Sequence, residues 1–374
     1  MCKVIKGYTM KVIISRTELV QLIGTIQGVV SSKPAIPILA NILIEAFDGN
    51  LIISATDLTV STRAQTMANV IEEGAITLPA KRFFQLVREM TAQDVEIECT
   101  TGEIAYVRGG SSEFRINGIH KSEFPSLPDM SQGQSFTLSG GTFKEMLSKS
   151  VFAAAREDSR HVLNGVLMQI EGSTATFVGT DGKRLAKIHT SIEIDTEHKH
   201  DYLLPLKACE EIVKMIDEDE ALKISLLPDK VGIEVGSTTL VTKLLSGDYP
   251  DIERVIPTAS EQKFTLHREE LMSLLKQIAL FTSEKNHSVH FIFNPGELTL
   301  TANSSDIGDG KVSMPVDYSG DKFEIAFNPF YFHDILRHCK DETVSFAITN
   351  AHNPGLITDS STANFVIMPM RLSA

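Results

Sequence analysis

The sequence predicts an α+β protein built from three copies of one domain, each with two helices and antiparallel sheets. Two sequence signals recur three times, in step, and each marks a strand that leads into a helix. The length of 374 residues favours several domains, because it exceeds the size at which one hydrophobic core keeps growing. Most of the remaining sequence alternates between apolar and polar residues around glycine-containing turns, which is typical of antiparallel strands.

The first signal is a change of hydrophobic period from two to 3.6. It starts at the strand anchors Val12, Phe136 and Phe264, and each strand leads into the apolar stripe of an amphipathic helix. The stripe opens at the same distance from the anchor in all three copies. Its residues are Leu19, Leu22, Ile23 and Ile26 in the first copy, Phe143, Met146 and Leu147 in the second, and Leu271, Leu274, Leu275 and Ile278 in the third.

The second signal is a strand that ends at a proline before a helix. Pro79, Pro205 and Pro329 occupy this place, and proline is tolerated in the first turn of a helix. Each copy therefore contains two strand-then-helix halves. Three unrelated domains with accidentally similar patterns are the alternative, which the agreement of two independent signals disfavours.

Domain boundaries follow from the copies and from the segments that connect them. We expect an N-terminal extension at 1–9 and domains at 10–132, 133–258 and 259–374. The connecting segments FPSLPDMSQGQ and YPDIERVIPTAS are rich in proline and polar residues, as linkers usually are.

Charge and cysteine content limit the classes of function. The formal net charge of −13 by itself argues against nucleic-acid binding, because phosphate contacts need Lys and Arg. No apolar run is long enough to span a membrane, and residues 1–9 lack the features of a secretion signal. The four cysteines are far apart, which fits neither a disulfide framework nor a metal site, so we expect a cytoplasmic protein.

The sequence contains no motif of a common catalytic site. The patterns GxxxxGK[ST], HExxH, GxSxG and CxxC are absent. His198 and His200 flank Lys199, but a solvated turn explains this charged segment better than a metal site does. We therefore expect no catalytic residue, no metal and no cofactor. An enzyme with an unrecognised site and a protein scaffold that does not bind DNA remain as alternatives.

Three segments carry a specific resemblance to a known family. They are KPAIPILANILI at 33–44, TDGKRLA at 180–186 and FVIMPMRL at 365–372. Together with the threefold repeat, they resemble the bacterial sliding clamps, the β subunits of the replicative DNA polymerase, from Met10 onward. The resemblance implies a non-catalytic, head-to-tail homodimeric ring that encircles double-stranded DNA, with helices around the hole. Twelve helices about 10 Å wide would form a circle roughly 38 Å in diameter, which leaves room for a DNA duplex.

The resemblance also implies partners and a role. The ring would tether the replicative polymerase α subunit, the clamp loader, and other polymerases and repair proteins through short linear motifs. Such tethering confers processivity on the polymerase.

A ring holds DNA by topology, so a net-acidic chain can enclose DNA if its basic residues face the hole. The family's DNA-contacting positions match Lys33 and Lys81. In the loop REDSRHVLNG the sequence departs from the family at Glu157, His161 and Val162, which leaves Arg156 and Arg160 as candidates. The alternative is ordinary surface charge, or a solvated turn at Lys33. The predicted helices also offer Arg82, Arg88, Lys144, Lys149, Lys207, Lys214, Lys276, Arg337 and Lys340.

The resemblance places a pocket for partner peptides between the second and third domains. Two methionines suit a groove that accepts many sequences, because thioethers repack readily. The alternative makes FVIMPMRL a core strand with a frayed end. His352 and Pro354 are expected near the pocket. The matching residues are Leu163, Thr180, Gly182, Lys183, Arg184, Leu185, Pro250, Arg254, Val255, Val366, Met368, Pro369, Met370, Arg371 and Leu372.

Three further positions match the family's dimer contact. They are Phe114 in the first copy and Leu280 and Phe281 in the third. Their alternative is a place in the internal core.

Overall fold

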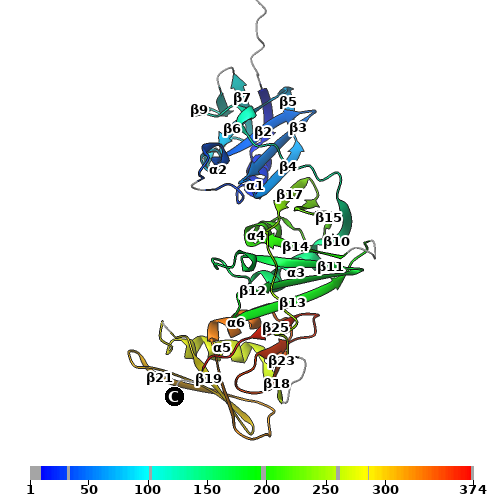
Figure 1. Ribbon diagram of the computed structural model, residues 1–374. Helices are drawn as coiled ribbons and strands as arrows, with labels where there is room; N and C mark the ends of the chain where they lie inside the picture. Colours follow the sequence, from blue (N-terminus) through cyan, green and yellow to red (C-terminus); the bar gives the residue numbers. More distant parts are fainter. Residues whose placement is uncertain are drawn as a thin grey trace, which may run out of the picture. The chain divides into compact units, whose positions relative to one another are not determined.

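The computed structural model describes residues 10–31, 34–100, 103–194, 199–257, 262–284 and 286–371 (Figure 1). The chain divides into two compact units. Unit 1 holds the chain up to Lys144 together with Lys207–Leu244, and unit 2 holds Glu145–Leu206 together with the chain from Leu245 onward. The division falls inside the second predicted repeat, so each unit combines part of that repeat with a complete neighbour.

Unit 1 contains two sheets. One has the strand order β5-β1-β7-β8-β9 and the other β10-β15-β16-β17-β4-β3-β2-β6. Its strands are β1 (Met10–Ser15), β2 (Asn41–Phe47), β3 (Asn50–Thr56), β4 (Val60–Met67), β5 (Asn69–Glu72), β6 (Gly74–Pro79), β7 (Asp94–Thr100), β8 (Ile104–Gly109), β9 (Ser112–Asn117), β10 (Gln134–Ser139), β15 (Ala221–Leu227), β16 (Lys230–Val235) and β17 (Thr238–Lys243). Its α-helices are α1 (Arg16–Ile26), α2 (Ala80–Glu89) and most of α4 (Leu206–Met215), and short 3₁₀ turns span Pro37–Ala40 and Lys121–Glu123.

Unit 2 also contains two sheets, with the orders β14-β11-β12-β13-β25-β24-β23-β18 and β21-β20-β19-β22. Its strands are β11 (Gly165–Glu171), β12 (Thr174–Thr180), β13 (Arg184–Ser191), β14 (Lys199–Pro205), β18 (Gln262–His267), β19 (Val289–Asn294), β20 (Glu297–Ser304), β21 (Gly308–Pro315), β22 (Phe323–Phe327), β23 (Thr343–Ile348), β24 (Gly355–Thr358) and β25 (Asn364–Ile367). Its helices are most of α3 (Gly140–Val151), α5 (Arg268–Ala279), α6 (Pro329–His338) and a 3₁₀ turn at His161–Leu163.

The predicted strand-then-helix halves are confirmed in every copy. β1 alternates buried and partly exposed residues, and all four apolar stripe residues of α1 are buried. Pro79 and Pro205 end edge strands, where a missing N–H breaks few ladder bonds. Pro329 instead opens α6, where Asn328 caps the helix by accepting a hydrogen bond from the Phe330 N–H at 2.9 Å.

Each eight-stranded sheet joins strands of two successive repeats. In the first joint, inside unit 1, β17 pairs antiparallel with β4, from Thr238 opposite Ala64 to Thr242 opposite Val60. In the second joint, inside unit 2, β25 pairs antiparallel with β13, from Asn364 opposite Lys187 to Ile367 opposite Arg184. The five-stranded and four-stranded sheets end instead at the edge strands β9 and β21.

Candidate functional site

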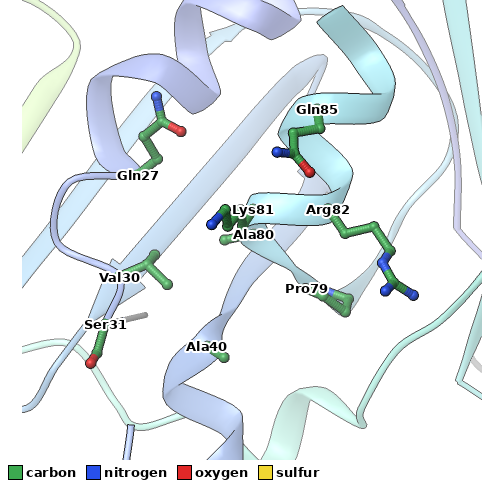
Figure 2. A pocket seen from close by; sticks show the side chains of 9 residues that line it. All are labelled: Gln27, Val30, Ser31, Ala40, Pro79, Ala80, Lys81, Arg82 and Gln85. Carbon is green, nitrogen blue, oxygen red and sulfur yellow. The ribbon is translucent and has the colours of Figure 1, made fainter. Parts of the chain in front are cut away.

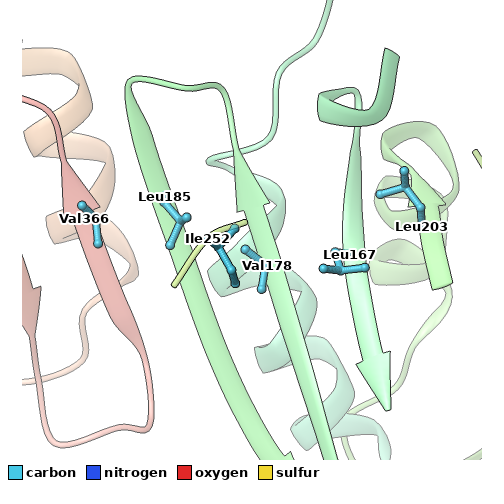
Figure 3. Packing of buried hydrophobic residues seen from close by; sticks show 6 residues of the cluster. All are labelled: Leu167, Val178, Leu185, Leu203, Ile252 and Val366. Atoms are coloured by element: carbon cyan, nitrogen blue, oxygen red, sulfur yellow. The ribbon is translucent and has the colours of Figure 1, made fainter. Parts of the chain in front are cut away.

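A cluster of buried apolar side chains lies at the second joint. Leu185 of β13 lies directly opposite Val366 of β25, and both are buried. Figure 3 shows how these side chains gather with those of the neighbouring strands and of the segment after β17. The cluster consists of Leu167, Val178, Leu185, Leu203, Ile252 and Val366, with Val162, Leu245, Tyr249, Ile256 and Leu356 packed against it.

The TDGKRL segment forms a tight turn beside this cluster. The Thr180 hydroxyl donates to the Arg184 carbonyl at 2.6 Å and accepts from the Gly182 N–H at 3.1 Å. The Asp181 carboxylate accepts from the backbone N–H groups of Lys183 and Arg184 at 2.9 and 3.0 Å. Gly182 has φ +81°, a conformation that favours glycine. The turn is therefore fixed by its own side chains.

The Arg184 side chain is held inside the second joint. It forms ion pairs with Asp181 at 3.1 Å and with Asp334 of α6 at 2.6 Å. The guanidinium carbon lies 4.7 Å from the centre of the Tyr331 ring and 5.5 Å from that of Phe152. Only 11% of the side chain is exposed. Arg184 therefore positions the turn and offers little surface to a ligand.

The segment after β25 is bound to the fold at two points. The Met368 N–H donates to the Lys183 carbonyl at 2.9 Å, and the Met370 N–H donates to the Ala326 carbonyl of β22 at 2.7 Å. Met368 remains 39% exposed, and Arg371 is exposed. The alternative of a frayed end is wrong for residues 368–370, because backbone bonds hold them. Leu372 lies outside the described residues.

The linker that closes the other side of the cluster exposes apolar surface. Ile252 is buried in the cluster, whereas Val255 is 39% exposed and Pro250 is exposed. Arg254 forms an ion pair with Asp251 at 2.8 Å, and its side chain is 84% exposed. Exposed apolar and cationic side chains thus border the cluster. We use the name groove for this border together with the buried cluster beneath it.

The other predicted pocket residues lie beneath or beside the groove. Leu163 and Thr180 are buried, and Lys183 is exposed. His352 is exposed in a turn in which the Asn350 side chain accepts its N–H at 2.9 Å, and Pro354 is partly exposed. That turn leads to Leu356, which packs on the cluster.

Lys81, a predicted DNA contact, lies at the start of α2 beside Arg82, and both side chains are exposed (Figure 2). They line a hollow of about 530 Å³ together with Gln27 and Val30 at the end of α1. Lys33 lies outside the described residues.

Arg156 and Arg160 lie near the TDGKRL turn. Arg156 is exposed and, with Asp181 and Lys183, lines a hollow of about 360 Å³. Arg160 forms an ion pair with Asp158 at 3.0 Å, and its hydrogen bonds lower the pKa of that carboxyl to about 2. A Cβ on Gly182 would lie only 3.0 Å from the Arg160 guanidinium, so Arg160 covers the turn.

The prediction that Lys149 faces the hole of the ring is wrong. Lys149 is 4% exposed and donates to the Ser361 hydroxyl at 2.7 Å, with Glu145 at 3.2 Å and Asp359 at 3.6 Å. These acceptors satisfy its charge inside unit 2, so it cannot face DNA. Burial raises the pKa of Asp359, but the hydrogen bonds from Ser361 and Lys340 and the charge of Lys149 outweigh it and lower the pKa.

The remaining helix cations differ in availability. Lys207 donates to the Val29 carbonyl at 2.8 Å and pairs with Asp57 at 2.5 Å, and Lys144 pairs with Glu218 at 2.8 Å. These two therefore have partners within unit 1. The others are exposed, although Lys214 pairs with Glu211 at 2.7 Å and Lys340 with Glu145 at 2.9 Å. These exposed cations are Lys81, Arg82, Arg88, Lys214, Lys276, Arg337 and Lys340.

The three predicted dimer residues are not internal core in the single chain. Leu280 is 72% exposed at the end of α5, and Phe114 is 39% exposed on β9. Phe281 is half-buried, with its ring against the backbone of Gly310 on β21.

Comparison with known proteins identifies the family. Residues 10–128, 137–251 and 253–371 match, in order, the N-terminal, central and C-terminal domains of the DNA polymerase III beta subunit. The chain belongs to this family. Its members, the sliding clamps, are non-catalytic processivity factors in DNA replication.

Relatives match the chain along nearly its whole length. The beta sliding clamp of Chlamydia muridarum is 53% identical over 97% of this chain and 99% of its own, and that of Escherichia coli K12 is 32% identical over 97% and 100%. A sliding clamp from Bartonella birtlesii bound to griselimycin has a TM-score of 0.94 and 27% identity, covering 98% of this chain and 100% of that one. A clamp from Bacillus subtilis has a TM-score of 0.93 and 26% identity, covering 97% and 100%.

The described part of the chain contains neither a metal-binding cluster nor a membrane-spanning helix. No group of three or more His, Cys, Asp or Glu side chains there could hold a metal ion. No helix among the described residues is long and apolar enough to cross a membrane.

Sequence reasoning missed the residues that build this clamp's groove from below. Leu167, Val178 and Ile252 form its base, and Tyr331 and Asp334 hold Arg184. Alternation along a strand indicates which side chains are buried, but not which of several cores receives them. Asp334 lies in the middle of α6, and no pattern in the sequence links it to Arg184.

Proposed function

We propose that this clamp encircles duplex DNA as a head-to-tail homodimer and binds apolar peptide segments of its partners in the groove. The partners are the replicative polymerase α subunit, the clamp loader, and other polymerases and repair proteins, and the place of action is the cytoplasm. The groove carries the proposal, because it combines a buried apolar base with exposed Val255 and Met368 at its border.

The groove chemistry favours a short apolar segment. Burial of peptide side chains against Val255 and Met368 supplies affinity, and the flexible thioether adapts to different side chains. Gly182, with φ +81°, keeps the turn beside the groove tight. The exposed cations Lys183, Arg254 and Arg371 border the same surface and favour acidic residues beside the apolar ones.

Retention on DNA by enclosure needs only weak phosphate contacts. The chain carries a net charge of −13, yet the exposed helix cations Lys81, Arg82 and Arg88 are concentrated on α2. Weak contacts of this kind permit sliding, because no single phosphate is held tightly. Lys81, and with it Arg156 and Arg160, are the proposed DNA contacts among the described residues.

The repeat supports a head-to-tail dimer. β4 and β13 are the fourth strands of their repeats, and each pairs with the last strand of the next repeat, β17 or β25. The fourth strand of the last repeat is β21, and the last strand of the first repeat is β9, and both are sheet edges. Pairing β21 of one copy with β9 of another would repeat the same joint.

Retention on DNA tests the ring. Loaded by a clamp loader with ATP, the protein is expected to stay on circular DNA and to slide off after the circle is cut. Equal release from both forms would contradict enclosure, and lack of any DNA retention would favour a scaffold that acts without DNA.

Truncation tests the groove separately. Removal of residues 368–374 is expected to weaken binding of a fluorescent polymerase α-subunit peptide by at least about a hundredfold, because the Met-rich border is lost. The dimer mass should not change. Removal of residues 373–374 alone is the matched control. Unchanged peptide affinity after the longer truncation would exclude the groove.

A further inference from the structure

The two joints inside the chain share one interior pattern. In the first joint Leu240 of β17 lies opposite Thr62 of β4, and in the second joint Phe365 of β25 lies opposite Ala186 of β13. All four side chains are buried. A large apolar residue on the last strand of one repeat thus covers a small residue on the fourth strand of its neighbour.

β9 has the large residue of this pattern. β9 follows β8 as β17 follows β16, through a two-residue turn whose first residue is a glycine with positive φ, Gly110 or Gly236. Counted from these turns, Phe114 occupies the place of Leu240. Phe114 is 39% exposed on the edge strand β9, whereas Leu240 is buried inside the first joint.

β21 has the small residue. Counted from the turn before β20 and from the turn before β12, Ala302 and Gly179 occupy the same place in their strands. Ala302 pairs with Gly310 on β21, and Gly179 pairs with Ala186 on β13. Gly310 therefore occupies the place of Ala186. Because Phe281 and Ile278 lie against Gly310 on the helix side, a ring opposite Gly310 would join this apolar surface.

We propose that β9 of one copy pairs with β21 of a second copy with Phe114 opposite Gly310, and that two ion pairs on the other face fix this register. The proposal rests on the dimer proposed above and specifies its contact. With Phe114 opposite Gly310, antiparallel pairing puts Glu113 opposite Lys311 and Arg115 opposite Asp309. All four charged residues are exposed in the single chain.

Other registers bring like charges together. A shift by two residues in one direction puts Glu113 opposite Asp309, and the opposite shift puts Arg115 opposite Lys311. Like charges directly opposite each other destabilise a strand pair, whereas opposite charges stabilise it. A shift by one residue turns Phe114 away from the interior, so it is excluded by burial.

The internal joints have no such ion pairs at the corresponding positions, which supports a role in recognition between copies. Covalent connection already limits which strands meet inside one chain, whereas separate copies must encode the register in side chains. Asp309 and Lys311 line an open hollow of about 700 Å³, which leaves their charged ends accessible. The corresponding internal pairs are Thr239 with Arg63 and Val241 with Ser61 in the first joint, and Asn364 with Lys187 and Val366 with Leu185 in the second.

Charge reversal on one strand at a time tests the register. One variant carries Glu113→Lys and Arg115→Glu, and the other carries Asp309→Lys and Lys311→Glu. Each alone is expected to raise the dimer dissociation constant at least about a hundredfold at low salt, because both contacts of the dimer become repulsive. An equimolar mixture should recover dimers, because a mixed dimer contains one doubly reversed contact and one native contact. Recovery also establishes that each variant is folded.

The outcomes separate the register from the dimer itself. A native mass near 41.1 kDa instead of twice that value would overturn both the dimer and the register. A native dimer that resists both reversals, or variants that are not rescued by mixing, would overturn the register alone. Glu113 also forms an ion pair with Arg108 at 3.2 Å, which its substitution would break. Mixing Arg115→Glu with Asp309→Lys repeats the test with Glu113 unchanged. The matched control, Glu171→Lys with Lys199→Glu, reverses an exposed ion pair elsewhere and should leave the mass unchanged.

Cross-linking measures the register directly. Directly opposite residues in an antiparallel pair have Cα atoms about 4.5–5.5 Å apart, which permits a disulfide. Glu113→Cys with Lys311→Cys should therefore give covalent dimers on mild oxidation. Glu113→Cys with Asp309→Cys, shifted by two residues, should give less than about a tenth as much. The reverse yield would overturn the proposed register.

Discussion

The two internal joints have the same backbone pairing but different side-chain supports. In the first joint, one cation, Lys207, connects to Asp57 and the Val29 carbonyl, and its side chain is 41% exposed. In the second joint, Arg184 lies between two carboxylates and two aromatic rings, and it is 11% exposed. The groove lies beside the second joint.

This difference indicates how a repeated fold acquires one specialised site. The strand pairing recurs because every copy has the same elements, but the groove needs a fixed turn and a fixed last strand. Arg184 fixes the turn, and the Met368 N–H bonded to Lys183 fixes the segment after β25. The first joint has the simpler polar contact of Lys207.

The largest expected effect is at Arg184. Arg184→Ala leaves Asp181 and Asp334 without their cation inside the second joint and should lower the free energy of unfolding by about 3 kcal/mol. Peptide affinity should fall at least about tenfold, because the turn loses its support. Urea unfolding and peptide titration measure the two effects. Arg184→Lys should recover less than half, because an ammonium cannot replace a planar guanidinium. Full recovery by Lys would contradict the proposed role.

Lys149→Met should have the second-largest effect on the free energy of unfolding, and this effect should depend on pH. Lys149→Met leaves the buried Asp359 carboxylate with the Ser361 hydroxyl and the backbone N–H groups of Lys340 and Ser361, at a cost of about 2–3 kcal/mol near neutral pH. The pKa of Asp359 is lowered from 3.8 in the fold, so its stabilisation is present above that value and is lost as pH falls through the folded pKa.

Unfolding by urea at neutral pH and at a pH below the folded pKa of Asp359 tests this expectation. The difference between the native protein and Lys149→Met should be smaller at the acid pH, where Asp359 becomes neutral. A difference that stays constant between the two conditions would exclude the Asp359 pair as its source.

Lys207→Ala tests the first joint and should have a smaller effect. Its side chain is 41% exposed and its ion pair is screened by solvent, so a loss of about 1 kcal/mol is expected. The effect should shrink further in 1 M salt. Peptide affinity at the groove should not change. A loss as large as that of Arg184→Ala would mean that the two joints are equally supported.

Gly28→Ala should have the smallest effect of the series. An added Cβ would lie 2.0 Å from the Glu211 carboxylate, the far end of a flexible side chain that can move away. We expect less than about 1 kcal/mol of destabilisation, measured by urea unfolding. Gly28→Ala combined with Glu211→Ala should unfold like Glu211→Ala alone. A larger loss in the double variant would place the cost elsewhere.

Local patterns could be predicted from the sequence, whereas long-range partners could not. The stripe of α1 and the proline before α2 followed from hydrophobic period and backbone chemistry, which depend on near neighbours. The role of Lys149 depends on Asp359, far along the chain, so its position on a helix suggested a surface charge. The joining of β4 to β17 is likewise a non-local pairing that no pattern within either strand encodes.

The groove was predictable in its residues but not in its construction. TDGKRLA and FVIMPMRL marked both sides through resemblance, and the structure brings Leu185 and Val366 together. Nothing in their spacing indicated that Arg184 would face inward, because that depends on Tyr331 and Asp334 from another repeat.

In the proposed dimer, the unlike edges β9 and β21 determine how assembly stops. Each contact uses one edge of either kind, so a growing assembly always keeps one free edge of each kind at its ends. Growth ends only when the last free edge meets the first. A change that alters the angle between successive copies should therefore yield a ladder of longer, open oligomers.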